Sequence, residues 1–143
     1  KERFDYGPDF EKDILASGLP KLAKGRYTVL VPQVDRDGNE IGGIRMPELE
    51  VPTGTATGWS LRAADDGSPG ELCYLDGVFV PFAKNKADRI AKHDPRPSLS
   101  ERYPTEQAYV VRVRASAEAL KQRGYLLEED VERAEKRAQS VRW

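Results

Sequence analysis

Residues 105–123 read TEQAYVVRVRASAEALKQR and residues 127–141 read LEEDVERAEKRAQSV, and these two stretches decide the fold of the C-terminal end. Each carries apolar residues at spacings of three and four, the pattern of a helix that buries one face. The first stripe consists of Val110, Val113, Ala117 and Leu120, and the second of Leu127, Val131, Ala134, Ala138 and Val141. Gly124 offers a helix C-cap between them, and the second stretch starts with three acidic residues, which a helix N-terminus favours. We therefore predict an antiparallel helical hairpin.

Shorter helices are predicted upstream of this hairpin. Asn85 is a suitable N-cap for a helix over residues 86–92, which a Pro-rich stretch then ends. Residues 98–103 predict one further helical turn, and residues 8–15 predict a turn or two near the N-terminus.

Strands are predicted mainly in the first 83 residues. Residues 26–31 (RYTVLV) are β-branched and aromatic and form the best strand candidate. The Asp-Gly turn within residues 35–40 (DRDGNE) predicts a hairpin, with residues 41–46 as the return strand. Weaker strands are predicted within residues 55–61 and 72–80, with ordered loops around them.

These elements predict an α+β fold with a small, mostly antiparallel sheet or hairpin, long ordered loops and a C-terminal helical hairpin. We expect a single unit over residues 1–143, as the length suggests, with a strand- and loop-rich part over residues 1–83 and a helical part over residues 84–143. The chain starts at Lys1 and its single methionine is Met46, so we expect the C-terminal segment of a longer chain. A processed or trimmed small protein is the alternative.

Composition limits the classes of function. Hydrophobic residues make up 38%, charged residues 33%, and the net charge is −1, which gives a modest core and no overall field for nucleic acid. No apolar run reaches the ~20 residues that span a bilayer. We therefore expect no nucleic acid and no membrane among the partners. One cysteine excludes an internal disulfide and a cysteine zinc site, and we expect no cofactor.

No catalytic residue is assigned to this chain. Residues 58–62 (GWSLR) match the first three positions of the G-x-S-x-G nucleophile elbow, but Arg62 stands where close packing of that turn requires glycine. His93 is the only histidine and lies in a polar stretch that predicts a helix end, where a cation complements the helix dipole. The sequence therefore offers no convincing nucleophile–base pair.

Two further patterns favour structural roles. Asp35, Asp37 and Asn39 have the alternating oxygens that begin an EF-hand calcium loop, but Gly38 stands at its fourth position instead of its sixth. A hairpin turn explains these residues better, and we assign no metal site. Cys73 lies in an apolar run, which predicts a small core residue.

A basic cluster precedes the helical hairpin and lies near Tyr103. Its members are Lys84, Lys86, Arg89, Lys92, Arg96 and Arg102. The carboxylates of Asp88, Asp94 and Glu101 are interspersed, and no aromatic residues alternate with the basic ones, so a solvated helix face is favoured over a ligand site. Salt-dependent anion binding by this cluster is the weaker alternative.

Trp59 and Arg62 are the residues for which we expect a binding role. Trp59 offers a large flat surface with one N–H donor, and Arg62 offers a planar fork that fits a carboxylate. One interpretation makes Trp59 the anchor of a long loop, with Arg62 in a structural ion pair. The other places both residues in the substrate-binding cleft of a larger protein.

Several motifs occur together in a fixed order along the chain. They are residues 4–8 (FDYGP), 27–40 (YTVLVPQVDRDGNE), 43–48 (GIRMPE), 57–62 (TGWSLR), 70–72 (GEL), 79–83 (FVPFA), 94–103 (DPRPSLSERY), 125–131 (YLLEEDV) and Trp143. In this order and spacing they resemble the C-terminal part of large bacterial "alpha/beta hydrolase domain" proteins, over nearly the whole chain.

The resemblance implies a parent protein with an α/β-hydrolase-like core upstream of this segment. Such a protein is expected to hydrolyse a small-molecule ester or another acyl bond, with a nucleophile in the upstream core. This chain would then be a non-catalytic C-terminal segment that contacts the upstream core of the same protein and supports its substrate cleft through Trp59 and Arg62. The alternative is a free-standing interaction or anion-binding module without enzymatic activity.

Overall fold

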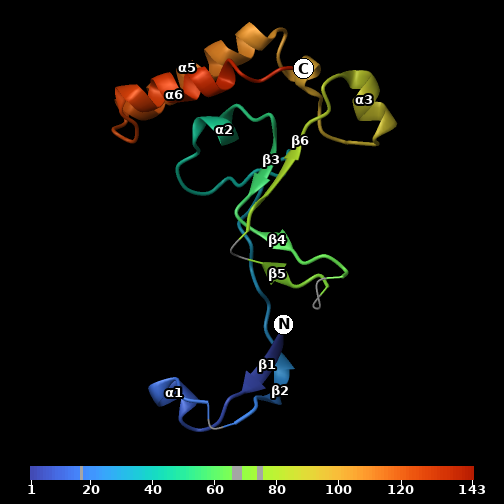
Figure 1. Cartoon of the computed structure of the whole chain (residues 1–143), viewed down its shortest axis with the longest axis vertical. Coiled ribbons are helices and arrows are strands. Elements are labelled where there is room, and N and C mark those ends of the chain that lie inside the picture. The colour runs from blue at the N-terminus through green and yellow to red at the C-terminus, as the bar shows by residue number, and fades with distance from the viewer. Residues whose placement is uncertain (17, 66–68, 74–75) are drawn as a thin grey trace. The chain divides into compact units, whose positions relative to one another are not determined.

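The C-terminal helices form the hairpin that the sequence predicts. In the computed structural model, which describes all residues except 17, 66–68 and 74–75, α5 (Glu106–Gln122) and α6 (Glu128–Ala138) pack side by side (Figure 1). The Thr105 hydroxyl caps α5 by accepting a hydrogen bond from the backbone N–H of Ala108 at 3.0 Å. Gly124 follows α5 with a φ of +80°, a conformation that costs glycine little.

The apolar stripes of both helices form most of the core. The buried members are Val110, Val113, Ala117, Leu120, Val131, Ala134 and Ala138, all of them predicted. Leu127 was assigned to the second stripe and is exposed instead. It precedes α6 as its N-cap residue, where its backbone N–H donates to the Asp130 carboxylate at 3.0 Å, while Leu126 packs against the core.

Aromatic side chains extend this core beyond the hairpin. The ring centroids of Tyr103 and Tyr109 lie 5.1 Å apart, and Trp143 packs against both, at 6.0 Å and 5.8 Å. Val51 and Phe82, from the loop-rich part of the chain, are buried in the same core. Two short helices contribute buried residues beside it, Pro47 from α2 (Pro47–Glu50) and Leu99 from α4 (Leu99–Arg102), whereas α3 (Lys86–Ala91) has none.

Two antiparallel ribbons form most of the strand structure between α2 and α3. The first pairs β3 (Gly54–Thr57) with β6 (Val78–Pro81), and the second pairs β4 (Ser60–Leu61) with β5 (Leu72–Cys73). Strands were predicted in both regions, although residues 74–75 of the longer prediction lie outside the described residues. A Cβ on Gly54 would lie 2.7 Å from the Phe79 ring, so glycine is needed for the ring to cover β3.

The N-terminal strand was predicted in the wrong place. Strand β2 covers Lys21–Arg26 and pairs with β1 (Glu2–Asp5). Of the strand predicted over residues 26–31, only Arg26 therefore belongs to a strand. Tyr27 and Lys1 still exchange backbone hydrogen bonds, but the residues after Tyr27 have no strand opposite them in the described structure. Propensity alone does not make a strand without a partner. The predicted helical turn is α1 (Phe10–Asp13).

The predicted hairpin at residues 35–40 is confirmed at its turn and wrong in its return strand. Val34 and Glu40 form a single antiparallel bridge around the turn, and Gly38 has a φ of +83°. Ile41 still donates its backbone N–H to the Gln33 carbonyl at 3.0 Å. Residues 42–46 form no strand; they include two glycines, and the Arg45 side chain folds back to hydrogen-bond Asp35.

The fold class is α+β, as predicted, with about 34% of residues in helices and 18% in strands. The contacts divide the chain into two compact units, Lys1–Val31 and Pro32–Trp143. The predicted division at residue 83 separates a strand- and loop-rich part from a helical part, not two compact units. This division stays a prediction. Within the described residues, no helix has the length and apolar character needed to cross a membrane.

Candidate functional site

The turn at residues 35–40 is built around one carboxylate. Oδ1 of Asp35 accepts hydrogen bonds from the backbone N–H groups of Asp37 at 2.9 Å and Asn39 at 3.0 Å. A Cβ on Gly38 would lie 2.8 Å from the Thr55 methyl group, so this glycine is required both by its φ and by the close approach of β3. The turn therefore holds its side chains in fixed directions against the ribbon.

Asn39 and Thr55 attach the turn to strand β3. The Asn39 side-chain amide donates to the Gly54 carbonyl at 3.2 Å, and its carbonyl accepts from the Ala56 N–H at 2.7 Å. The Thr55 hydroxyl donates to the backbone carbonyl of Asp37. Asn39 thus occupies the outer edge of β3 as a neighbouring strand would.

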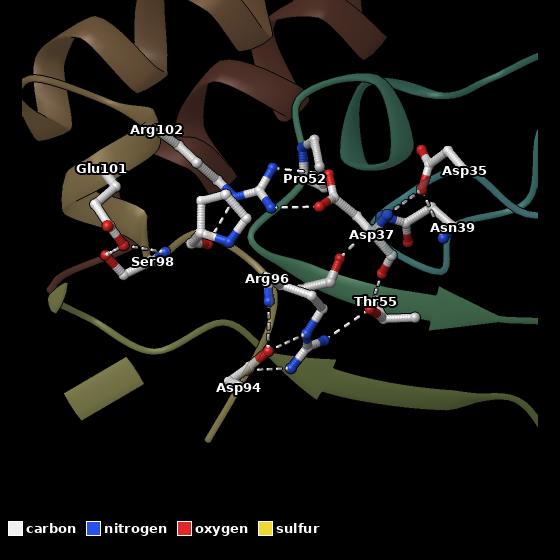
Figure 2. Close-up of polar contacts among 12 residues, drawn as sticks. Asp35, Asp37, Asn39, Pro52, Thr55, Asp94, Arg96, Ser98, Glu101 and Arg102 are labelled. Atoms are coloured by element: carbon white, nitrogen blue, oxygen red, sulfur yellow. Dashed lines mark hydrogen bonds and ion pairs between the residues drawn. The ribbon is translucent and has the colours of Figure 1, made fainter. Parts of the chain in front are cut away.

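Asp37 forms a bidentate ion pair with Arg102 of α4 (Figure 2). Arg102 Nη1 lies 2.8 Å from Asp37 Oδ2, and Nη2 donates to Oδ1. The two side chains are only 8% and 11% exposed, respectively. Arg102 is further fixed by its Nε–H bond to the Pro97 carbonyl at 2.8 Å and by the Phe82 ring, whose centroid is 4.0 Å from the guanidinium carbon.

A second arginine lies against the same phenylalanine. The guanidinium carbon of Arg96 is 5.0 Å from the Phe82 centroid. Arg96 binds Asp94 through Nη2 at 2.7 Å and Nε at 2.9 Å, and it donates to the Thr55 hydroxyl at 2.7 Å (Figure 2). The Arg96 hydrogen bonds lower the pKa of Asp94 to about 2. This carboxylate is therefore ionised at neutral pH and neutralises Arg96.

Glu101 and Ser98 form a capping box at the N-terminus of α4. Its Oε2 accepts from the Ser98 hydroxyl at 2.6 Å and from the Ser98 backbone N–H at 2.9 Å, and it also pairs with Arg89 at 2.9 Å. The Ser98 hydroxyl is the largest of the causes that lower the pKa of Glu101 to about 2.

A pocket of about 690 Å³ lies beside the Asp37–Arg102 pair. Arg45 lines it and binds Asp35 Oδ2 at 2.9 Å and the Leu49 carbonyl at 2.6 Å. Tyr103 lines it too; its hydroxyl donates to the Pro52 carbonyl at 2.8 Å, and burial raises its pKa to about 12. Arg36 and Arg112 complete the basic part of the lining.

The loop that contains Trp59 and Arg62 lies elsewhere in the second unit. Trp59 is half-buried between β3 and β4, and Arg62 is exposed after β4, with its backbone N–H donating to the Glu71 carbonyl at 2.9 Å. Neither residue lines the 690 Å³ pocket. The indole N–H of Trp59 is buried and has no hydrogen-bond acceptor among the residues that the structure describes. Buried side-chain donors in folded proteins usually have a hydrogen-bond partner.

Comparison with known families gives one match. Residues 7–136 match the model of the family described as alpha/beta hydrolase domain. The chain belongs to this family. The resemblance to alpha/beta hydrolase domain proteins that the ordered motifs indicate is thereby confirmed, and the match supports a hydrolase-like protein. Neither a curated protein nor a solved structure matches it.

Among the residues that the structure describes, no hydrogen bond joins a serine or cysteine side chain to His93. Ser60 lies inside β4 and pairs with Cys73, whereas a nucleophile elbow places its serine on a sharp turn from a strand into a helix. His93 is exposed just after α3, with a φ of +52° and its backbone N–H bonded to the Ile90 carbonyl at 3.1 Å. It ends a helix, as predicted.

Cys73 differs from its prediction. It is half-buried in β5 instead of lying in the core, because the β4–β5 ribbon is only two strands wide and does not cover its side chain. Within the described chain, no group of three or more His, Cys, Asp or Glu side chains is placed to hold a metal ion. The oxygens of Asp35 and Asp37 are used by arginines and by the turn itself.

The arginines of the predicted basic cluster are neutralised within the protein. Arg89, Arg96 and Arg102 pair with Glu101, Asp94 and Asp37, in that order. Tyr103, expected to accompany the cluster, is buried in the core. Sequence reasoning missed the pairing of Asp37 with Arg102 and the pocket beside it, because 65 residues separate the two partners and nothing local connects them.

Proposed function

We propose that this chain is the non-catalytic C-terminal segment of a longer serine-type hydrolase of ester or other acyl bonds. In this proposal it packs against the α/β-hydrolase core of the same protein, and the loop with Trp59 and Arg62 borders the substrate cleft. Membership of the hydrolase family supports the reaction class. The observation that carries the segment role is the exposed apolar strand β6.

Strand β6 exposes side chains that normally lie inside proteins. Val78, Phe79 and Val80 are all exposed, and Phe79 is 57% exposed. Since successive side chains of a strand point to opposite faces, apolar residues are uncovered on both faces of β6. These exposed apolar side chains favour a further layer of protein over β6.

The absence of a catalytic role rests on the chain's single histidine. His93 is exposed at the end of α3, and none of the hydrogen bonds described for it joins it to a serine or cysteine side chain. A serine-type mechanism needs a histidine beside the nucleophile. The proposed upstream core would supply that pair, together with the elbow that residues 58–62 do not form.

The cleft role of the Trp59 loop is supported by its unpaired donor. A buried indole N–H without an acceptor costs free energy unless another group completes it. An acceptor from the upstream core or from bound substrate would do so. Arg62 is exposed directly after β4, three residues beyond Trp59.

The alternative of a free-standing anion-binding module has less support in its original form. Three of the six basic residues assigned to it are held in ion pairs with carboxylates. Their positive charge is therefore already balanced within the chain.

Paired substitutions test the docking of β6. Phe79→Ser and Val111→Ser remove apolar side chains with the same exposure, 57%, from β6 and from the outer face of α5. In the 143-residue chain, each change should alter the free energy of unfolding by less than about 0.5 kcal/mol. In the protein encoded by the full reading frame, Phe79→Ser should lower the melting temperature and Val111→Ser should not. Equal effects in the full protein, or a reading frame without an upstream G-x-S-x-G, would refute the segment role.

Enzyme assays test the remaining claims. The 143-residue chain should not hydrolyse p-nitrophenyl butyrate; turnover that His93→Ala abolishes would show a catalytic site in this chain. In the full protein, Trp59→Ala should lower kcat/KM and leave the melting temperature nearly unchanged. If Trp59 is instead a loop anchor, the same change should cost about 3–5 kcal/mol of stability without changing activity per folded molecule.

A further inference from the structure

The 690 Å³ pocket beside the Asp37–Arg102 pair is lined by four arginines and four carboxylates. Three of the carboxylates are hydrogen-bonded to arginines: Asp35 to Arg45, Asp37 to Arg102, and Glu101 to Arg89. Glu50 lies 3.4 Å from Arg45 Nε, an atom that has no hydrogen-bond partner among the described residues.

Two of the lining arginines have no such partner. Among the described residues, no carboxylate lies within ion-pair distance of Arg36 or Arg112. The contact described for Arg112 is with the Tyr103 ring, whose centroid lies 5.3 Å from its guanidinium carbon. A guanidinium over an aromatic face keeps its N–H groups available at its edge. The pocket thus offers the N–H donors of two exposed guanidinium groups that no carboxylate of the described residues binds.

Both arginines come from backbone that is held in place. Arg36 stands between Asp35 and Asp37, the two residues that fix the turn against Arg45 and Arg102. Arg112 lies in the middle of α5, next to the buried Val113. A ligand that engages both side chains would therefore order two side chains and no backbone, which limits the entropy lost on binding.

We propose that this pocket binds a small organic dicarboxylate, with one carboxylate on Arg36 and the other on Arg112. The planar fork of each guanidinium fits a carboxylate through two parallel hydrogen bonds. Pro97, which is half-buried, supplies apolar surface in the lining between them. The volume is within the range of small-molecule sites. This site is independent of the proposed cleft role of Trp59 and Arg62, which line no part of it.

Calorimetry on the 143-residue chain with three matched compounds tests the ligand class. Adipate carries two carboxylates, hexanoate carries one on a chain of the same length, and adipamide is the neutral analogue. At constant ionic strength, adipate should bind most tightly, hexanoate more weakly by about tenfold or more, and adipamide not measurably. Equal binding of hexanoate, tighter binding of inorganic phosphate, or no binding of adipate would overturn the proposal.

Substitutions test the residues. Arg36→Gln and Arg112→Gln should each weaken adipate binding by about tenfold or more. Lys92→Gln removes the same charge from the exposed end of α3 and should leave the affinity unchanged. If Arg112→Gln disturbs the melting curve, Arg112→Lys keeps the charge without the fork and should still weaken binding. An equal loss in all variants would indicate non-specific attraction and overturn the assignment.

Discussion

The α5–α6 hairpin and the β3–β6 ribbon bury their apolar residues to very different extents. Both helices turn most of their apolar stripe into the core of the second unit. The ribbon leaves three consecutive apolar residues of β6 exposed. Its edges are covered by polar side chains, with Asn39 on β3 and Arg96 on the Val80 and Pro81 carbonyls of β6. The helices therefore provide their own core, whereas the ribbon is closed at its edges and open on its faces.

This difference predicts that substitutions in the two regions affect different properties of the protein. Substitutions in the hairpin should act on the folding of this chain by itself, because its contacts are complete. Substitutions on the faces of the ribbon should act mainly where another protein surface covers it. The Asp37–Arg102 pair connects the two regions, since Asp37 belongs to the turn bonded to β3 and Arg102 to the short helix before α5.

The largest effect is expected at this connection. Asp37→Ala leaves the Arg102 guanidinium buried without its counter-charge, and such changes cost about 3–5 kcal/mol of unfolding free energy. Urea denaturation followed by circular dichroism measures the loss. Glu129→Ala is the control, because Glu129 and Arg133 form an exposed pair at 3.8 Å on α6, and such pairs contribute about 0–1 kcal/mol. A similar small cost for both changes would mean that the Asp37–Arg102 pair does not hold the two regions together.

The next prediction compares one substitution in the two environments. Leu120 of α5 is 4% exposed and Leu61 of β4 is 59% exposed. Leu120→Ala removes a core side chain and should lower the unfolding free energy by about 2–5 kcal/mol. Leu61→Ala should change it by less than about 0.5 kcal/mol in the 143-residue chain. A large cost at Leu61 would show that the ribbon carries more of the chain's own stability than its burial indicates.

The parts of the fold that were predictable from sequence are the local ones. α5 and α6 have a periodic stripe and end signals within a few residues, and α3 has its cap at Asn85, whose side chain accepts from the Asp88 N–H as expected. The strands were less predictable, since pairing depends on a partner elsewhere in the chain. Residues 28–31 have strong β propensity but no strand opposite them in the described structure. The strand lies instead at residues 21–26, where β1 pairs with it.

The candidate site was predictable only in pieces. The turn at Asp37 and the basic residue Arg102 were both noticed, but in separate motifs, and their pairing depends on tertiary structure. From the sequence, Arg112 is expected to be an ordinary polar residue on the surface of α5, because it lies outside the apolar stripe that contains Val110 and Val113. Nothing in the sequence indicates the pocket that it lines. The family motifs, by contrast, were readable because their order along the chain is itself information.

A smaller effect is expected from a single buried hydroxyl. Tyr103→Phe removes the hydrogen bond to the Pro52 carbonyl, which joins the loop region to the helical core. The lost bond and the unsatisfied carbonyl should lower the unfolding free energy by about 1–2 kcal/mol. Tyr125→Phe, on an exposed tyrosine after α5, should have no measurable effect. Equal melting temperatures for the two variants and the unaltered chain would contradict a structural role for this bond.

The smallest effect concerns the response to acid and is local to α4. The pKa of Glu101 is lowered from 4.5 to about 2 in the folded chain, chiefly by the Ser98 hydroxyl. A carboxylate with a lowered pKa stabilises the fold above its unfolded pKa and loses that contribution as the pH falls through the folded value. The unfolding free energy should therefore decrease from about pH 5 towards pH 2, with Asp94, whose pKa is also about 2, contributing to the same decrease.

Ser98→Ala should make this decrease shallower, because Glu101 then protonates nearer its ordinary pKa. The comparison is of slopes, since the loss of the cap also lowers stability at neutral pH. Ser100→Ala, on an exposed serine of the same helix, should leave the slope unchanged. An unchanged slope in Ser98→Ala would place the acid sensitivity outside α4, in Asp35 and Asp94, whose pKa values are also lowered.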